Sequence, residues 1–225
     1  MKEQVRGYIE RYKSIVNMFI FMIGYLAAFR WLEQRRIRHY HVIHFVLDDS
    51  IPFCEYFIIP YLLWFLFVAF TVLYIGIVNQ DEGRRMGNFL MIGMTVFIIV
   101  STIYPNIQHL RPHTFVRDNV FVDMVRFLYR GDTPTNILPS IHVFNSIGVM
   151  IALYRDERCK RHKVIQGALM LLGVSIILAT MFLKQHSMID VFSAFALSGV
   201  TYILCYRQEF QPHTAREVSP ARISK

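Results

Sequence analysis

The stretch YFIIPYLLWFLFVAFTVLYIGIV, residues 56–78, decides the fold of this chain. It contains no charged residue. At a rise of about 1.5 Å per residue, a helix of this length crosses the hydrocarbon core of a bilayer, which needs roughly 20 residues. The stretch therefore predicts a transmembrane helix, and the rest of the chain is interpreted with this helix as its reference.

Similar apolar runs recur along the chain, so we predict six transmembrane helices. The five other runs cover residues 14–32, 86–104, 137–154, 164–183 and 187–206. The composition agrees, because 54% of the 225 residues are hydrophobic and only 18% are charged. The predicted fold is all-α, with one polytopic membrane domain over residues 1–225. We interpret the first run as a retained anchor, since it lacks a clear cleavage signature.

The distribution of Lys and Arg predicts the orientation of the helices. If the N-terminus is cytoplasmic, the segment RDERCKRHK (residues 155–163) and both terminal segments also face the cytoplasm, and this side holds the larger share of Lys and Arg. The arginines near residues 30–38 favour the opposite orientation. We predict a multi-pass protein of the cell membrane with both termini cytoplasmic.

The net charge of +8 predicts contact with anionic lipid head groups, so no nucleic-acid partner is predicted. The three cysteines, Cys54, Cys159 and Cys205, are isolated in the sequence and lack the spacing of metal or redox motifs. We predict no cofactor and no metal site, because no set of three or four ligands occurs at metal-binding spacing.

Three polar segments adjoin the apolar runs. PNIQHLRPH (residues 105–113) follows the third run, LPSIH (residues 138–142) opens the fourth, and LKQHSMID (residues 183–190) opens the sixth. Because successive helices alternate in direction, all three segments lie at one membrane face, which is the outer or lumenal face in the predicted orientation. Ionisable side chains at such positions are costly unless they have a function. The sequence therefore predicts a functional site at this face.

The residue types in these segments suit phosphoryl transfer. His186 and Asp190 are four residues apart and share a helix face, so the carboxylate can accept the imidazole N–H and orient the ring. His142 supplies a second imidazole, and Arg111 supplies a guanidinium that binds phosphate oxygens. The two helix starts add free N–H groups and a positive dipole. We predict a nucleophile and a separate acid at this site.

Simpler interpretations of these residues stay open. Residues 139–140, a Pro-Ser pair, are common at the start and cap of a helix. His142 alone is compatible with a polar tip at the membrane interface. Three acidic residues near the second helix form either a polar interfacial turn or a rim that selects a polar head group or orders the loops; they are Asp48, Asp49 and Glu55.

The order of these motifs is similar to that of a known family. Arg111-Pro112, then the Pro-Ser-x-His of residues 139–142, then His186 with Asp190 resembles the type 2 phosphatidic acid phosphatase superfamily. That superfamily also contains glucose-6-phosphatase, bacterial undecaprenyl-pyrophosphate phosphatases and vanadium haloperoxidases. The resemblance covers a core of about residues 86–206, and six helices are the usual membrane form of the family.

The resemblance implies a role for each matched residue. His186 would attack phosphorus and form a phosphohistidine, with Asp190 orienting it. His142 would protonate the leaving oxygen, and Ser140 and Arg111 would hold the phosphate. The implied substrate is a phospholipid or a polyprenyl phosphate, and the implied activity is that of an integral membrane lipid phosphatase.

Two positions depart from the family pattern. Tyr104 stands seven residues before Arg111, where the family has Lys, and Thr180 stands six residues before His186, where the family has Arg. Lys184 is our candidate for a partial replacement of these cations. Fewer cations also characterise the branch that looks like inositol phosphorylceramide and sphingomyelin synthases, which move a phosphorylated head group between lipids.

Three functions therefore remain open at this stage. The first is a lipid phosphatase that uses water as the acceptor. The second is a phosphotransferase that uses a lipid hydroxyl as the acceptor at the same site. The third is a non-catalytic membrane lipid binder or transporter with a degraded phosphate site. A haloperoxidase fits poorly, because those enzymes are soluble and need the full set of cations.

Overall fold

The computed structural model describes residues 2–207, and it describes the side chains of residue 13 and residues 15–207. Residues 208–225 of the predicted domain, including the basic C-terminal tail, lie outside this range. The described chain is an all-α bundle with these helices: α1 (Lys2–Gln34), α2 (Ile58–Val78), α3 (Gln80–Ile103), α4 (Val120–Gly131), α5 (Ile141–Arg155), α6 (Glu157–Arg161), α7 (Lys163–Phe182) and α8 (Met188–Tyr206).

The predicted membrane architecture is confirmed. Within the described residues, five stretches have the length and apolar composition to span a membrane: Ile15–Gln34, Glu55–Val78, Gln80–Ile103, Lys163–Phe182 and Met188–Tyr206. The sixth predicted run, residues 137–154, is the shorter apolar helix α5, with 15 residues. The chain is thus an all-α polytopic membrane protein whose fourth apolar run forms a shorter helix than its sequence suggested.

Helix α5 lies in the interior of the bundle, where it packs against α2, α3, α7 and α8. The packing against α3 is close because of Gly93. A Cβ atom added to Gly93 would lie 2.0 Å from the ring of Phe144, and that ring stacks on Phe89 at 4.6 Å between centroids. Gly148 of α5 similarly leaves room for Phe89. Small residues that allow close helix approach are typical of membrane bundles.

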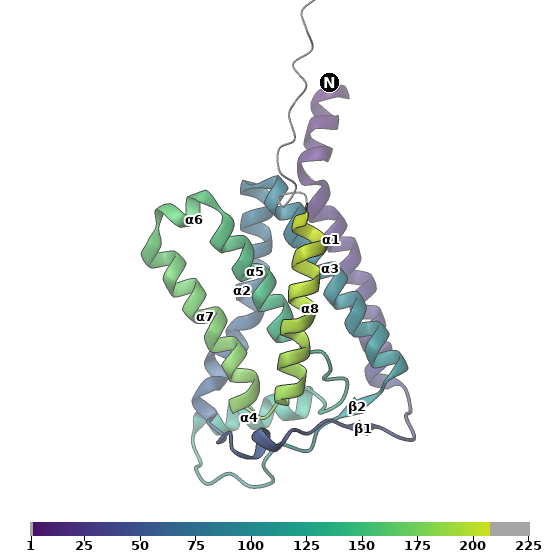
Figure 1. Cartoon of the computed structure of the whole chain (residues 1–225), viewed down its shortest axis with the longest axis vertical. Coiled ribbons are helices and arrows are strands. Elements are labelled where there is room, and N and C mark those ends of the chain that lie inside the picture. The colour runs from purple at the N-terminus through teal and green to yellow at the C-terminus, as the bar shows by residue number, and fades with distance from the viewer. Residues whose placement is uncertain (1, 208–225) are drawn as a thin grey trace, which may run out of the picture.

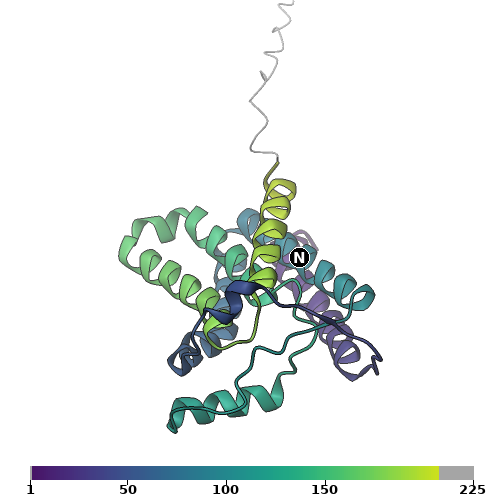
Figure 2. The ribbon, with the colours of Figure 1, turned by 60° about the horizontal axis from the view of Figure 1, so that its bottom comes forward.

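The two ends of the bundle differ (Figure 1). At one end, here called the α4 end, lie α4 and two short strands, β1 (His41–Val42) and β2 (Asn106–Ile107), which pair in parallel. Two 3-10 turns, η1 (Val46–Asp49) and η2 (Glu55–Phe57), belong to the segment between α1 and α2. At the opposite end, the α6 end, lies α6. Figure 2 shows α4 and the connecting segments from the α4 end.

Helix α4 is amphipathic and was not predicted. It has 12 residues, which is too short to span a membrane, and it carries charges on its exposed side. Asn119 begins it by accepting a hydrogen bond from the Val122 amide at 3.0 Å, and Val122 and Val125 are buried beneath it. The Tyr129 hydroxyl donates to the Leu183 carbonyl at 2.6 Å. This bond ties α4 to the loop that carries the candidate site.

Candidate active site

The loop between α7 and α8 positions His186. The amides of Gln185 and His186 both donate to the Thr180 carbonyl, at 2.9 and 3.0 Å, so the chain turns tightly at the end of α7. Lys184 adopts a φ of 53° within this turn. Ser187 then caps α8, and its side chain accepts from the Ile189 amide. The turn and the cap together fix the backbone on both sides of His186.

Asp190 holds the imidazole of His186. His186 Nδ1 lies 3.3 Å from Asp190 Oδ2, and the same oxygen accepts a hydrogen bond from the Ser187 amide at 2.9 Å. Asp190 is fully buried and His186 is 8% exposed. Because a carboxylate accepts at Nδ1, this nitrogen carries the proton, and Nε2 keeps its lone pair free for chemistry. The predicted pairing of His186 with Asp190 is present.

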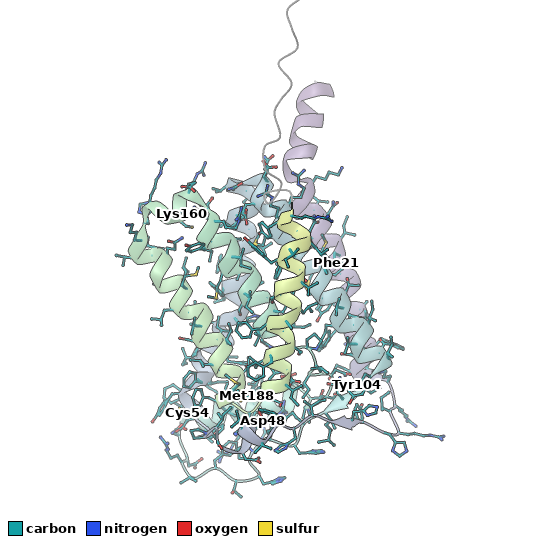
Figure 3. All side chains as sticks on the ribbon, viewed as in Figure 1. Phe21, Asp48, Cys54, Tyr104, Lys160 and Met188 are labelled. Atoms are coloured by element: carbon teal, nitrogen blue, oxygen red, sulfur yellow. The ribbon has the colours of Figure 1, made fainter. Side chains whose placement is uncertain are left out.

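Asp48 fixes the start of α8 from a distant part of the chain. Its Oδ2 accepts from the Ser187 hydroxyl at 2.6 Å, and its Oδ1 accepts from the Met188 amide at 2.8 Å. Figure 3 shows Asp48 and Met188 together at the α4 end. The ammonium of Lys184 donates to the Asp48 carbonyl at 2.7 Å. Desolvation lowers the pKa of Lys184, against the opposing effect of Asp48 and Asp49.

His142 lies in the first turn of α5 and faces His186. The centroids of the two imidazole rings are 5.7 Å apart. Two aromatic side chains of α2 contact His142: Tyr61 at 4.7 Å and Trp64 at 4.3 Å between ring centroids. Ser140 caps this helix, with its hydroxyl accepting from the Val143 amide at 3.4 Å. The capping bond is consistent with the simpler interpretation of Ser140, and phosphate binding by its hydroxyl stays a prediction.

Arg111 is anchored by backbone carbonyls and by an aromatic ring. Its Nη1 donates to the carbonyl oxygen of Asp132 at 2.7 Å, and its guanidinium lies 4.5 Å from the Tyr129 ring centroid. Its Nη2 donates to Gln185 Oε1. Desolvation lowers the pKa of Arg111, and the carboxylate of Asp132 opposes this effect. The guanidinium stays protonated at neutral pH, because an arginine side chain does not lose its proton in proteins.

Six residues near His186 form a connected set, here called the polar ring, in which each member contacts the next or, for Gln185 and His186, precedes it in the chain. Its members, in order, are His142, His186, Gln185, Arg111, Asp132 and Tyr61. The bond that closes it runs from the Tyr61 hydroxyl to Asp132 Oδ2 at 3.4 Å. The members come from α2, α5 and three separate loop segments. The polar ring thus brings together two imidazoles, one guanidinium, one amide, one carboxylate and one phenol.

The residues predicted from sequence are not all in the ring. His142, His186, Asp190 and Arg111 meet at the α4 end, as the alternation of helix directions predicted. Lys184 instead points its ammonium at the Asp48 carbonyl, so its role toward phosphate stays a prediction.

The two departures from the family pattern provide no polar group to the ring. Tyr104 stacks on His41 at 4.0 Å, and Figure 3 shows it away from Asp48 and Met188. Thr180 is fully buried, and its hydroxyl donates to the Ile177 carbonyl at 2.7 Å.

Sequence reasoning missed four members and neighbours of the ring: Tyr61, Trp64, Asp132 and Gln185. Tyr61 and Trp64 lie within an apolar run and look like ordinary lipid-facing aromatics in the sequence. Gln185 carried a usable signal, because it is an uncharged polar residue directly before His186.

The acidic residues near the second helix have structural partners. Glu55 is buried and accepts from Asn119 Nδ2 at 3.1 Å, with Arg117 Nη1 at 3.3 Å. Asp49 pairs with His44 at 3.0 Å, and this hydrogen bond raises the pKa of His44. These contacts order the loops of the α4 end, as one interpretation of the acidic rim expects, and selection of a head group by the rim stays a prediction.

Within the described part of the chain, no group of three or more His, Cys, Asp or Glu side chains is arranged to hold a metal ion. Comparison of the sequence with protein-family models, with curated proteins and with solved structures gave no match. The functional assignment therefore depends on the geometry of the site and on the motif resemblance.

Proposed function

We propose that the protein is an integral membrane lipid phosphatase of the type 2 phosphatidic acid phosphatase kind, which hydrolyses a lipid phosphate or pyrophosphate through a phosphohistidine. The observation that carries this proposal is the pair of facing imidazoles 5.7 Å apart, one of which is held by a buried carboxylate. In the proposed reaction, one imidazole is the nucleophile and the other is the acid on the opposite side of the phosphorus atom.

The mechanism follows from the roles of these two side chains. His186 Nε2 attacks phosphorus, a P–N bond forms, and the P–O bond to the lipid breaks. His142 gives its proton to the leaving oxygen, and then takes a proton from the water that cleaves the P–N bond. The negative charge of a bound phosphate would favour the protonated form of His142.

The leaving group provides a diagnostic for His142. A poor leaving group depends strongly on protonation, whereas a good one depends on it less. His142→Ala should therefore slow hydrolysis of an alkyl phosphate more than hydrolysis of a pyrophosphate or an aryl phosphate. An equal loss with both kinds of substrate would contradict the role of His142 as the acid.

The proposal includes an orientation. The α6 end carries the basic segment of residues 155–163, and the positive-inside rule puts such a segment in the cytoplasm. The α4 end, with the polar ring, then faces the periplasm, the cell exterior or an organelle lumen. The test uses a cysteine-free chain with one cysteine at exposed Val116 or at exposed Val164. A membrane-impermeant maleimide should label Val116→Cys in intact cells and Val164→Cys only after lysis, and the reverse pattern would overturn the orientation.

The activity test uses purified protein in detergent or lipid. It is incubated with labelled phosphatidic acid, with a polyprenyl pyrophosphate, and with a phospholipid plus ceramide or diacylglycerol. Free phosphate and new phospholipid are measured together, with His186→Ala as the control. Free phosphate that disappears in the variant supports the phosphatase, and free phosphate that persists in the variant contradicts it.

A phosphotransferase is the second candidate, and the small number of cations favours it. Among the four positions considered for phosphate-binding cations, Tyr104 and Thr180 are uncharged, and the Lys184 ammonium is bonded to a backbone carbonyl. Arg111 remains as the guanidinium in the polar ring. A new lipid that carries the head group, formed without free phosphate, would identify this activity. If neither product forms with any of these substrates, the result favours a non-catalytic lipid binder or transporter.

A further inference from the structure

Gln185 directly precedes His186 and is only 2% exposed. Its backbone amide donates to the Thr180 carbonyl at 2.9 Å, so its position in the turn is fixed. Its side-chain Oε1 accepts from Arg111 Nη2. A guanidinium only donates hydrogen bonds, so the atom that faces it must be the amide oxygen. The orientation of the Gln185 amide is therefore set by chemistry, and its NH2 group points away from the Arg111 bond.

This NH2 group is buried and has no hydrogen-bond partner within the described chain. The same is true of Arg111 Nε. A buried N–H without an acceptor destabilises the protein, so such donors are rare unless a ligand or water accepts from them. Two neighbouring residues of the polar ring thus each hold an unused donor. Both donors are of the kind that binds an oxyanion.

A second buried glutamine in the same region allows a comparison of hydrogen-bond partners. Gln108 is 1% exposed, and its Nε2 donates to the Lys184 carbonyl at 2.9 Å. Its Oε1 accepts from the Leu110 amide. Both polar atoms of the Gln108 side chain are therefore used within the protein. A buried glutamine in this region can therefore satisfy both of its side-chain polar atoms, whereas Gln185 leaves its NH2 group without a partner.

We propose that Gln185 is a phosphate-binding residue whose side-chain NH2 donates to a non-bridging oxygen of the phosphate that His186 attacks, next to the Arg111 guanidinium. The inference rests on the proposed function, because it assumes that a phosphate reaches His186. Gln185 would act as a neutral donor in a site where the family pattern has an arginine at the position of Thr180.

Two substitutions separate phosphate binding from mere support of Arg111. Gln185→Glu keeps an oxygen for Arg111 but removes the donor and adds a negative charge. Gln185→Met removes both the donor and the oxygen at similar size and without charge. If Gln185 contacts phosphate, the glutamate variant binds phosphate more weakly than the methionine variant. If Gln185 only orients Arg111, the order is reversed.

The measurement is equilibrium binding of inorganic phosphate to the full-length protein in detergent. We expect Gln185→Met to weaken binding on the order of tenfold, since a hydrogen bond to a charged group is lost, and Gln185→Glu to weaken it further. Gln108→Met is the matched control and should lower the melting temperature while folded protein keeps wild-type affinity. Equal affinity of wild type and Gln185→Glu, or an equal loss in Gln108→Met, would overturn the inference.

The binding assay and the activity assay fail independently. If no lipid is hydrolysed but the expected order of phosphate affinities holds, the proposed function fails, and Gln185 is a phosphate-binding residue of a site with another function. If hydrolysis depends on His186 while both Gln185 variants bind phosphate like the wild type, the proposed function stands and the role of Gln185 fails. A wild-type protein that binds no inorganic phosphate also overturns the inference.

Discussion

The bundle carries a buried polar group of residues at each end, and the two are built differently. At the α6 end, both oxygens of Glu82 have partners: the Tyr206 hydroxyl at 2.7 Å and Arg155 Nε at 3.3 Å. The guanidiniums of Arg85 and Arg155 also lie over the Tyr206 ring. At the α4 end, Gln185 Nε2 and other buried polar atoms have no partner.

The difference teaches how to separate structural from functional polar groups inside a membrane bundle. Polar groups that satisfy one another rigidify the fold and leave nothing for a ligand. A surface depression of about 450 Å³ beside α6 fits this view, because Asp156 in its lining already accepts from the amides of Arg158 and Cys159. The α4 end instead keeps donors and an imidazole lone pair available, as a reaction site requires.

The largest effect should come from His186→Ala. Loss of the nucleophile should lower phosphate release at least about a thousandfold, since no neighbouring group replaces the Nε2 lone pair. The melting temperature in detergent should stay close to that of the wild type, because the cap of α8 by Asp48 and Ser187 is intact. Wild-type turnover by this variant with every lipid phosphate tried would refute the mechanism.

Asp190→Asn should have the next largest effect. The amide cannot match the carboxylate in accepting from both His186 Nδ1 and the Ser187 amide, so the imidazole loses its fixed tautomer. We expect phosphate release to fall on the order of a hundredfold, with a smaller loss of stability from the weakened cap. Steady-state rates and thermal unfolding of the same preparation measure both. A fall in stability with an unchanged rate per folded molecule would remove Asp190 from the site.

Glu82→Ala tests the α6 end. Removing the carboxylate breaks the bonds to Tyr206 and Arg155, and we expect the free energy of unfolding to fall by about 2 kcal/mol. The loss is smaller than for a fully buried ion pair, because the Arg155 side chain is 25% exposed. Denaturation in detergent measures the change. The rate of phosphate release per folded molecule should match that of the wild type. A large change in this rate without a loss of stability would mean that the α6 end also contributes to the reaction.

Asp48→Asn should give the smallest effect. The side chain keeps one acceptor for the Ser187 hydroxyl or the Met188 amide, so the free energy of unfolding should fall by only about 1 kcal/mol. Asp48 lies at the α4 end, near the candidate site, but both of its carboxylate oxygens have partners. Its substitution therefore tests whether hydrogen-bond satisfaction or location decides the role of a residue. Thermal unfolding and the pH profile of hydrolysis are measured for this variant. A shifted pH profile at unchanged stability would indicate that Asp48 takes part in the reaction.

The sequence predicted the helices well where hydropathy alone defines them. The run at residues 56–78 corresponds to α2, and the runs at 164–183 and 187–206 correspond to α7 and α8, with boundaries that differ by one or two residues. The start of α3 was missed because its first turn contains Asp81 and Glu82, which lower hydropathy but favour a helix N-terminus. Amphipathic α4 was missed because its charged residues lower its hydropathy below that of a membrane-spanning run.

The candidate site was predictable only in part. The four-residue spacing of His186 and Asp190 is a local property of a helix, and the meeting of three segments follows from alternating helix directions. The contacts of Tyr61 with His142 and of Asp48 with the start of α8 join residues that are far apart in the chain. No local pattern encodes such contacts, because they depend on how the helices pack.

The close approach of α3 and α5 at Gly93 has a mechanical consequence for the reaction. Phe144, which occupies the space left by the missing side chain, is only two residues beyond His142 on the same helix. A methyl group at Gly93 would push that ring outward and displace His142 with it. The position of His142, the acid of the proposed mechanism, therefore depends on the packing at Gly93, in the middle of α3.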